Sequence, residues 1–585
     1  MSLALPIIKS SPDFISELLR QQQSLTAVER FSSLQDRGAQ DRGALAESVE
    51  PAQAKYYRTL LPASPPGPGQ QFAFQVDLDK CSGCKACVVA CHTMNGLEEG
   101  EAWRRVGTVL ATSPQAGIQH VTTACHHCVD PGCLNGCPVK AYDKDPVTGI
   151  VRHLDDQCIG CKYCTMMCPY EVPKYNERLG IVRKCDMCHQ RLSNGEAPAC
   201  VQACPNEAIA ITVVSTLVAC DDESRLAPGA PLSVITQPTT IYQTSYQTSR
   251  EAVFSSSLPQ DFEIDEVADS HWPLAVLLVT TQASVGLIAF ERISALTAWG
   301  LGHSLTPSFS LAAGMLALLV AGVGLNLGAL HLGQPLRAWR VFLGLRTSWL
   351  SREAIVLGKY VGLLAAAVTM FILNVYRDTI PQALVDLSDG WVPGWLPSAM
   401  LSVAFIAGAT GLYCSAMIYV VTRRALWRAS RTFAAFGGST LVGGLALFVP
   451  LLLWFESSRF AIAFAATALC VSIVVKIAWE FQLRASTSVR GDAYDVRSRR
   501  LLAGPLKRWS ALRFLMALTG FALTGIALIG IALAAMAIGP DRGQTSMLAL
   551  AASSIAAVLL IGGELMERLI YFSSVVCDRM PGTMR

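Results

Sequence analysis

The sequence predicts an α+β module rich in cysteine, followed by an all-α bundle of eight transmembrane helices. Sixteen of the 20 cysteines lie between Cys81 and Cys204, whereas the apolar excess lies after Trp272. Charged residues make up 16% of the 585 residues, well below the roughly 25% of soluble globular proteins. This composition excludes disorder, collagen and coiled coil for most of the chain. The net charge of +3 gives no reason to expect a nucleic-acid partner.

Residues 1–71 precede the cysteine-rich module. Apolar residues at helical spacing predict a helix over 12–35, and the polar, then Pro-rich stretch 36–69 predicts a linker. The opening ten residues (MSLALPIIKS) contain a short apolar run that Pro6 breaks, with no basic residue before it. We therefore expect no secretory signal and a module that is not exported.

Four groups of four cysteines carry the chemistry of the module, which we place at 72–215. The groups are Cys81-Cys84-Cys87-Cys91, Cys125-Cys128-Cys133-Cys137, Cys158-Cys161-Cys164-Cys168 and Cys185-Cys188-Cys200-Cys204. The run C-x2-C-x2-C-x3-C-P is the bacterial ferredoxin pattern for [4Fe–4S] clusters, because a tight loop supplies three thiolates to a cube and the fourth comes from elsewhere. Sixteen cysteine ligands to iron therefore predict four [4Fe–4S] clusters.

Two other uses of these cysteines compete with iron–sulfur clusters. Disulfides require an oxidising compartment, which the absence of an export signal disfavours. Zinc sites prefer two pairs of cysteines to triplets with a trailing Cys-Pro. The spacing leaves one question open, because four motifs could exchange their last cysteines either in sequence or in a nested order. Alternating stretches at 72–76 and 208–212 predict strands of a duplicated ferredoxin-like fold.

The four groups, with a long gap in the last one, resemble the iron–sulfur subunit of the dimethyl sulfoxide (DMSO) reductase family over about 72–215. The resemblance implies the nested order, with four [4Fe–4S] clusters and no [3Fe–4S] cluster. The outer two ligand sets are Cys81, Cys84, Cys87 with Cys204, and Cys185, Cys188, Cys200 with Cys91. The inner two sets are Cys125, Cys128, Cys133 with Cys168, and Cys158, Cys161, Cys164 with Cys137. We interpret the basic residues beside these ligands as solvated surface, and the alternative is that their charges tune the cluster potentials: Lys85, Lys162, Arg183 and Lys184.

A polar tether at 216–271 leads to the membrane region, 272–585. Eight apolar stretches of spanning length lie there, too many for the buried helices of a soluble core. They are 273–296, 308–330, 354–375, 398–422, 431–455, 460–481, 513–538 and 546–573.

The loops between these stretches alternate in charge. Loops 331–352 and 423–431 carry four arginines each, loop 482–512 carries seven basic residues, and the intervening loops carry none or one. By the positive-inside rule the arginine-rich loops are cytoplasmic. We therefore expect a multi-pass protein of the bacterial inner membrane, with both termini and the iron–sulfur module on the cytoplasmic side.

The membrane region offers few haem ligands. After Trp272 the histidines are His303 and His331, at span ends on opposite faces of the membrane. They cannot share one haem, so we expect no haem and direct electron exchange between a quinol and the nearest cluster.

The stretch HLGQPLRAWRVFLGLRTSWLSRE (331–353) and the eight-span layout resemble the membrane anchor subunit of the same family. The resemblance links its histidine and its acid, here His331 and Glu353, to quinol binding. A histidine with a pKa near 6.5 suits a reaction that releases protons. The alternative is a histidine that caps the carbonyls of a helix end.

Ionisable residues inside a membrane are costly and are usually functional or paired. Those within or near the predicted spans are Glu291, Lys359, Lys476, Glu480, Glu564, Glu567 and Arg568. We expect Lys476 and Glu480 to pair at i,i+4. Glu564 is the candidate proton relay, and an interhelical salt bridge is the alternative.

The whole chain looks like a natural fusion of the electron-transfer subunit and the membrane anchor of a DMSO reductase-type enzyme. The resemblance implies an oxidoreductase subunit of anaerobic respiration that binds menaquinol or another quinol from the membrane quinone pool. Electrons would pass through the four clusters to a separate, molybdopterin-containing catalytic subunit. Two alternatives stay open: reverse flow from a formate- or hydrogen-oxidising partner to quinone, and a membrane scaffold without redox function.

Overall fold

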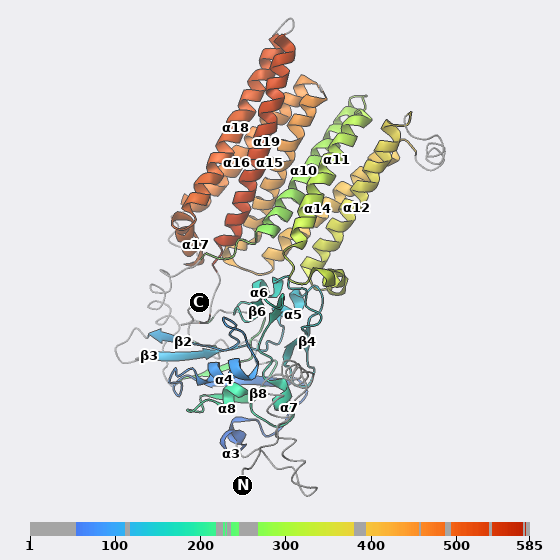
Figure 1. Cartoon of the computed structure of the whole chain (residues 1–585). Helices are drawn as coiled ribbons and strands as arrows, with labels where there is room; N and C mark the ends of the chain where they lie inside the picture. Colours follow the sequence, from blue (N-terminus) through green and yellow to red (C-terminus); the bar gives the residue numbers. More distant parts are fainter. Residues whose placement is uncertain are drawn as a thin grey trace, which may run out of the picture.

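The computed structural model describes residues 54–110, 118–217, 226–227, 230, 236–244, 267–378, 393–455, 458–485, 493–536, 541–576 and 580. Figure 1 shows a region of short strands and helices at one end and a bundle of long helices at the other. The α+β module followed by an all-α bundle is therefore confirmed. The helix predicted over 12–35 lies outside the described residues.

The main sheet of the iron–sulfur region joins its two ends. Strand β1 (Gln70–Asp77) pairs antiparallel with β8 (Ile209–Ser215) and parallel with β9 (Ile241–Gln243). Phe74 and Val76 of β1 pair with Ile211 and Ile209 of β8, and all four are buried on one face. Ala73 and Val214 are buried on the other face, so both faces of this pair are covered. The strands predicted at 72–76 and 208–212 lie within β1 and β8, apart from Ala208, which directly precedes β8.

Smaller elements fill the space between these ends. Three antiparallel pairs are β2 (Arg105–Leu110) with β3 (Ile118–Thr123), β4 (Tyr142–Lys144) with β5 (Val151–His153), and β6 (Lys174–Asn176) with β7 (Ile181–Arg183). The short helices are α4 (Ala86–Met94), α5 (Gly132–Gly136), α6 (Tyr163–Met167), α7 (His189–Ser193) and α8 (Ala199–Gln202).

Part of the segment expected as a linker is folded onto this region. Residues 54–60 form the helical turns α3 (Ala54–Tyr57) and η1 (Arg58–Leu60). Tyr57 is 2% exposed and belongs to the same apolar core as Phe74 and Ile209. The aromatic side chain therefore attaches the segment to the main sheet.

Among the described residues, eight helices are long and apolar enough to cross a membrane. They are α10 (Trp272–Gly300), α11 (Pro307–Ala329), α12 (Trp349–Val375), α14 (Leu396–Val420), α15 (Ala429–Trp454), α16 (Arg459–Ala485), α18 (Lys507–Met536) and α19 (Asp541–Ser573). Shorter elements connect them: η4 (Pro335–Gly344), η5 (Ala425–Trp427) and α17 (Ala493–Ala503). The eight-span prediction is confirmed by length and composition.

One boundary matters for the site. Helix α12 begins at Trp349, five residues before the predicted span. Arg352 and Glu353 directly precede the apolar stretch in the sequence, but the backbone is already helical at both of them. Glu353 therefore lies in the first turns of a membrane helix rather than in a loop.

The bundle consists of two groups of helices. Figure 1 shows α10, α11, α12 and α14 on one side and α15, α16, α18 and α19 on the other. The groups meet where Gly286 of α10 faces Gly444 of α15. A Cβ on Gly286 would lie 2.2 Å from the backbone oxygen of Thr440, so only small residues allow the two helices to approach this closely.

The segment between α11 and α12, residues 330–348, docks on the iron–sulfur region. The Gln334 backbone N–H donates to the Ile159 carbonyl at 3.0 Å, and the Gly344 N–H donates to the Pro138 carbonyl at 2.8 Å. Ser348 Oγ donates to the Gly136 carbonyl at 2.7 Å. We call this segment the docking segment; its backbone and side-chain donors bind backbone carbonyls of the cysteine-rich region.

Three glycines make this contact close. A Cβ on Gly333 would lie 2.1 Å from the backbone oxygen of Gly180, and a Cβ on Gly160 would lie 2.2 Å from the same oxygen. Backbone atoms cannot rotate away as a flexible side chain can. The contact therefore requires glycine on both sides.

We predict that Gly333→Ala destabilises the protein by about 1–3 kcal/mol, the usual cost of overpacking. The matched control is Gly358→Ala on α12, where an added Cβ meets no atom within 4 Å. Thermal unfolding in detergent, followed by tryptophan fluorescence, measures both variants. Equal unfolding midpoints for the two variants would contradict the steric argument.

Candidate functional site

Cysteine side chains surround enclosed spaces in the iron–sulfur region. One cavity is walled by Cys125, Cys128, Cys133 and Cys168, and a second is walled by Cys91, Cys185, Cys188 and Cys200. The remaining eight cysteines interact electrostatically within two further sets. One set is Cys81, Cys84, Cys87 with Cys204, and the other is Cys158, Cys161, Cys164 with Cys137. Each set takes three cysteines from one motif and the fourth from another. This arrangement favours the nested order over exchange in sequence.

The local backbone explains how each loop wraps its cavity. Lys85, Lys162 and Cys188 have positive φ angles of 62°, 58° and 50°, and each directly precedes a short helix. Two further residues with positive φ, Lys140 (54°) and Glu207 (53°), turn the next backbone N–H toward sulfur. Ala141 N lies 3.2 Å from Cys137 Sγ, and Ala208 N lies 3.3 Å from Cys204 Sγ. Such donors stabilise the thiolate form that binds iron.

The sixteen cysteines fit iron–sulfur clusters better than the two alternatives. All sixteen are free thiols, so the disulfide alternative is wrong. Within the described part of the chain, no three His, Cys, Asp or Glu side chains converge closely enough to hold a single metal ion. Thiolates around a cube of four irons stand farther apart than thiolates around one zinc ion. The spacing, free thiols and N–H···S contacts therefore suit the larger group.

Burial changes the chemistry of these thiols. Loss of water raises the pKa of Cys188 to about 12 and the pKa values of Cys137 and Cys168 to about 11, and neighbouring cysteines add to the rise for Cys188. The apoprotein therefore holds most of these groups as neutral thiols. Since iron binds the thiolate, assembly of the sites must release protons.

Two buried cations lie among the cysteines. Lys184 is 2% exposed, so its interpretation as a solvated surface residue is wrong. Arg104, which the sequence did not single out, is also 2% exposed. Burial lowers the pKa of each, but negative charge on the surrounding cysteines, as thiolate ligands would carry, raises it overall. Both side chains therefore carry a positive charge.

A cavity of about 290 Å³ lies where the iron–sulfur region meets α10, α11, α12 and α14. Leucines form much of its wall, and Cys161 and Tyr163 close the side toward the cysteines. His331 and Glu353 line the same cavity. A larger groove of about 860 Å³ runs along α11, but its lining is apolar apart from Asn326 and includes no cysteine.

His331 presents one free nitrogen. Its Nε2 atom is buried and has no hydrogen-bond partner among the described residues, while the ring bonds the backbone of Cys161. The ring of His271 packs edge-on against it, with 5.3 Å between centroids. Burial, then His271 and Lys162, lowers the pKa of His331 to about 4. His331 is therefore a neutral imidazole at neutral pH.

Glu353 lies on another wall of the cavity. It is 5% exposed, and one carboxylate oxygen accepts a hydrogen bond from Ser415 Oγ at 2.5 Å. Within the described residues, no hydrogen bond or ion pair joins Glu353 to His331. The two residues therefore line one cavity without a direct bond between them.

Comparison with known proteins assigns both halves of the chain. Residues 268–573, more than half of the chain, match the family model of the DMSO reductase anchor subunit. This protein belongs to the DMSO reductase anchor subunit family. Residues 117–214 match a 4Fe–4S dicluster domain. The polypeptide therefore joins an iron–sulfur electron-transfer region to this anchor.

Individual relatives cover the iron–sulfur half. The B subunit of the anaerobic dimethyl sulfoxide reductase of Escherichia coli K12 is 38% identical over 148 residues, which are 24% of this chain and 72% of the relative. The B subunit of the Haemophilus influenzae enzyme is 35% identical over 180 residues, 29% of this chain and 87% of the relative. The hydrogenase-2 operon protein HybA of Escherichia coli O157:H7 is 37% identical over 195 residues. That match covers 28% of this chain and 59% of HybA.

Several residues that line the cavity, or that contact its lining, lie outside the sequence-based expectations. His271 directly precedes the first membrane helix, a position that could have drawn attention, whereas Ser415 and Tyr419 sit in a uniformly apolar helix. Tyr163 lies between two cysteines of one motif and donates to the Ile418 carbonyl at 3.1 Å. No local signal marks the last three residues, because only tertiary packing brings them to the cavity.

Glu564 lies elsewhere, inside the bundle and 1% exposed. It accepts hydrogen bonds from Lys476, from Ser439 Oγ at 2.7 Å and from Arg513 at 2.9 Å. Glu480 pairs with Arg513 at 2.9 Å, so Lys476 and Glu480 each have a partner on another helix. The geometry favours the interhelical salt bridge over the proton relay for Glu564.

We predict that Glu564→Gln destabilises the protein by about 3–5 kcal/mol, because it leaves two buried cations without their shared carboxylate. Replacing Glu564 and Lys476 together by Met removes one charge of each sign and recovers much of the loss. Thermal unfolding in detergent compares the three proteins. A proton relay predicts instead a normal midpoint with lost turnover.

Proposed function

We propose that the chain is the electron-transfer and membrane-anchor subunit of an anaerobic respiratory oxidoreductase, and that it oxidises a quinol such as menaquinol. The observation that carries the proposal is the cavity between the two regions. Its wall contains Cys161, a proposed cluster ligand, together with two polar side chains on membrane helices or beside them. A lipid-soluble electron carrier can enter from the bilayer and stand next to the relay.

The sixteen cysteines would hold four [4Fe–4S] clusters in the nested sets. Each cluster, when bound, takes up and passes on one electron at a time. The set that contains Cys161 lies next to the cavity, and the set that contains Cys84 offers the most exposed cysteine of the sixteen. The set that contains Cys161 suits electron entry from the membrane, and the set that contains Cys84 suits exchange with a partner.

The cavity residues would bind and deprotonate the quinol headgroup. Oxidation of one quinol yields quinone, two electrons and two protons. His331 Nε2 can accept a hydrogen bond from one hydroxyl, and the backbone bond to Cys161 fixes its ring. Glu353, held by Ser415, can receive the other hydroxyl. The leucines exclude water and hold the ring of the quinol.

The arrangement of charge supports a cytoplasmic iron–sulfur region in the inner membrane. Arg337 and Arg340 of the docking segment donate to backbone carbonyls of the iron–sulfur region, at 3.2 Å to Cys158 and 2.7 Å to Asp156. Arg424 in the next arginine-rich loop donates to the Met166 carbonyl at 3.3 Å. The arginine-rich loops therefore share one face with the cysteines, and positive loops favour the cytoplasm.

The relatives suggest the partner. Two of them are named as the B subunit of an anaerobic dimethyl sulfoxide reductase, which favours a separate molybdopterin-type catalytic subunit that receives the electrons. HybA is named after a hydrogenase-2 operon, and this favours the second candidate, in which electrons flow from a hydrogen-oxidising partner to quinone. The same cavity serves either direction.

We predict that His331→Leu lowers quinol-driven reduction of the clusters at least tenfold, because Nε2 no longer accepts the hydroxyl. Dithionite should still reduce all clusters, and iron should stay at about sixteen per polypeptide. His303→Leu is the matched control, since His303 is exposed beyond the far end of α10. Stopped-flow absorbance with a quinol analogue measures the rate. A normal rate in His331→Leu would remove the site from this cavity.

The orientation has its own test. An epitope inserted after Gly302 should be accessible to antibody on intact spheroplasts, whereas one inserted after Gly195 should appear only after permeabilisation. Both glycines are exposed, and an added Cβ there meets no atom within 4 Å, so the insertions fit. The reverse pattern would place the arginine-rich loops and the cysteines outside the cytoplasm.

A further inference from the structure

Arg104 and Lys184 are buried cations that form no ion pair with a carboxylate. Each is 2% exposed, and among the described residues neither has an Asp or Glu oxygen within salt-bridge distance. An uncompensated charge inside a protein is expensive, so a nearby negative group must balance it. Cysteines stabilise both charges more strongly than any other ionisable group, with Asp186 a smaller contributor at Lys184. The two cations therefore depend on the cysteine sets around them.

We number the sets by their distance from the membrane helices. The first set is Cys81, Cys84, Cys87 with Cys204, and the second is Cys185, Cys188, Cys200 with Cys91; Arg104 lies between these two. Its Nη1 donates to Thr122 Oγ1 at 3.1 Å, and that hydroxyl lies 3.7 Å from Cys87 Sγ of the first set. The guanidinium also interacts with Cys91, Cys185 and Cys200 of the second set. The aromatic ring of Phe74 packs against it at 4.7 Å. The charge is thus held at the junction of the first and second clusters.

Lys184 lies at the next junction, between the second set and the third set, which is Cys125, Cys128, Cys133 with Cys168. Its Nζ lies 3.7 Å from Cys125 Sγ, which belongs to the third set. The same ammonium donates to the carbonyl of Cys185, a member of the second set, at 2.9 Å, and to the Val151 carbonyl. The second set therefore has a fixed cation on each side.

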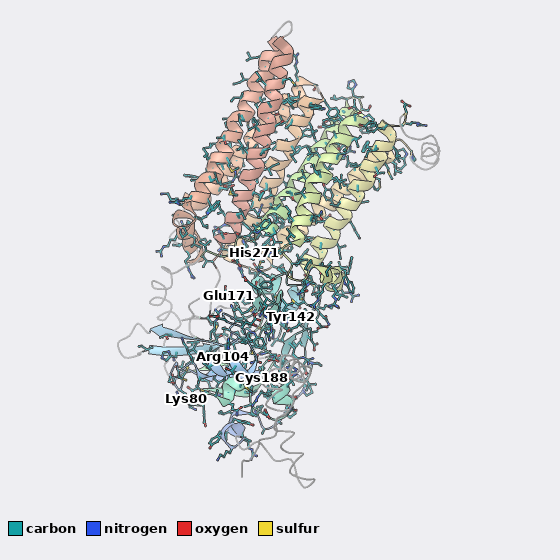
Figure 2. The ribbon with its side chains drawn as sticks, viewed as in Figure 1. Lys80, Arg104, Tyr142, Glu171, Cys188 and His271 are labelled. Carbon is teal, nitrogen blue, oxygen red and sulfur yellow. The ribbon has the colours of Figure 1, made fainter. Side chains whose placement is uncertain are left out.

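The last junction, nearest the membrane, is different. Tyr142 lies there, between the third set and the fourth set, which is Cys158, Cys161, Cys164 with Cys137. Its neighbours are Cys133 of the third set and Cys137 and Cys164 of the fourth. Figure 2 shows Tyr142 between Arg104 and His271, which marks the start of the membrane helices. The fourth set also contacts His153, but Asp155 pairs with that histidine. A neutral hydroxyl replaces the cation at this junction, and Arg337 reaches the fourth set from the membrane side instead, at 3.2 Å from the Cys158 carbonyl.

We propose that Arg104 and Lys184 raise the reduction potentials of the three clusters farther from the membrane, each of which lies beside at least one of these two cations. A fixed positive charge favours the reduced cluster, which carries one more electron, and low polarity strengthens the effect. The second cluster, flanked by both cations, has its potential raised most. The inference rests on the proposed cluster sets, and both residues act by positioning charge.

Redox titration of the full-length protein in membranes, monitored by electron paramagnetic resonance, tests the proposal. Lys184→Met should lower the equilibrium constant for reduction of two clusters about tenfold, which is about 59 mV for a one-electron couple. Arg104→Met should shift two clusters by the same amount, one of them shared with Lys184→Met. In the double variant one cluster should shift about a hundredfold. The cluster beside the cavity should keep its potential in every variant.

The controls separate charge from packing. Lys184→Arg and Arg104→Lys keep the charge and should keep the wild-type potentials, and Tyr142→Phe changes the uncharged junction without a shift. Unchanged potentials in both Met variants, or equal shifts in Lys184→Met and Lys184→Arg, would overturn the proposal.

The iron content of each variant distinguishes a loss of clusters from a shift in their potentials. If Lys184→Met loses iron and Lys184→Arg retains it, the charge is required as proposed; if both lose iron, shape rather than charge matters and the proposal is wrong. A wild-type protein without four clusters would instead contradict the proposed function. Failure of the inference and failure of the function are therefore distinct results.

Discussion

The arrangement of the molecule depends on the backbone contact between the docking segment and the iron–sulfur region. Without it, Cys161 would not reach the end of α11, and His331 would have no bond to the backbone of Cys161. Glycines on both sides bring main chain against main chain, so the contact is short and leaves little freedom. The cavity is a consequence of this contact, because its walls come from both regions.

The two regions solve the problem of buried charge in different ways. In the bundle, Lys476 and Arg513 are balanced by Glu564 and Glu480 across helices, as charges in a membrane must be. In the iron–sulfur region, Arg104 and Lys184 face sulfur instead of carboxylate. The first arrangement is complete in the protein alone. The second is balanced only when negative groups occupy the cysteine sets.

Sequence reasoning succeeded where the physical cause is local. Cysteine spacing follows from the size of one loop around one cube, and hydropathy follows from the lipid that surrounds each helix, so both regions could be predicted. The start of α12 was missed because Arg352 and Glu353 interrupt an apolar run without interrupting a helix. The burial of Lys184 and the packing of His271 on His331 depend on distant segments. No local pattern distinguishes such residues from exposed ones.

The presence of both regions in one polypeptide changes what the docking contact has to achieve. Two separate subunits must meet by diffusion and hold together by affinity, whereas a tethered pair meets at an effective concentration that can reach millimolar. A contact made of hydrogen bonds to backbone carbonyls and three closely packed glycines is then sufficient. The tether also fixes the stoichiometry, since every anchor is synthesised with one set of cysteines and no pool of unpaired subunits can form.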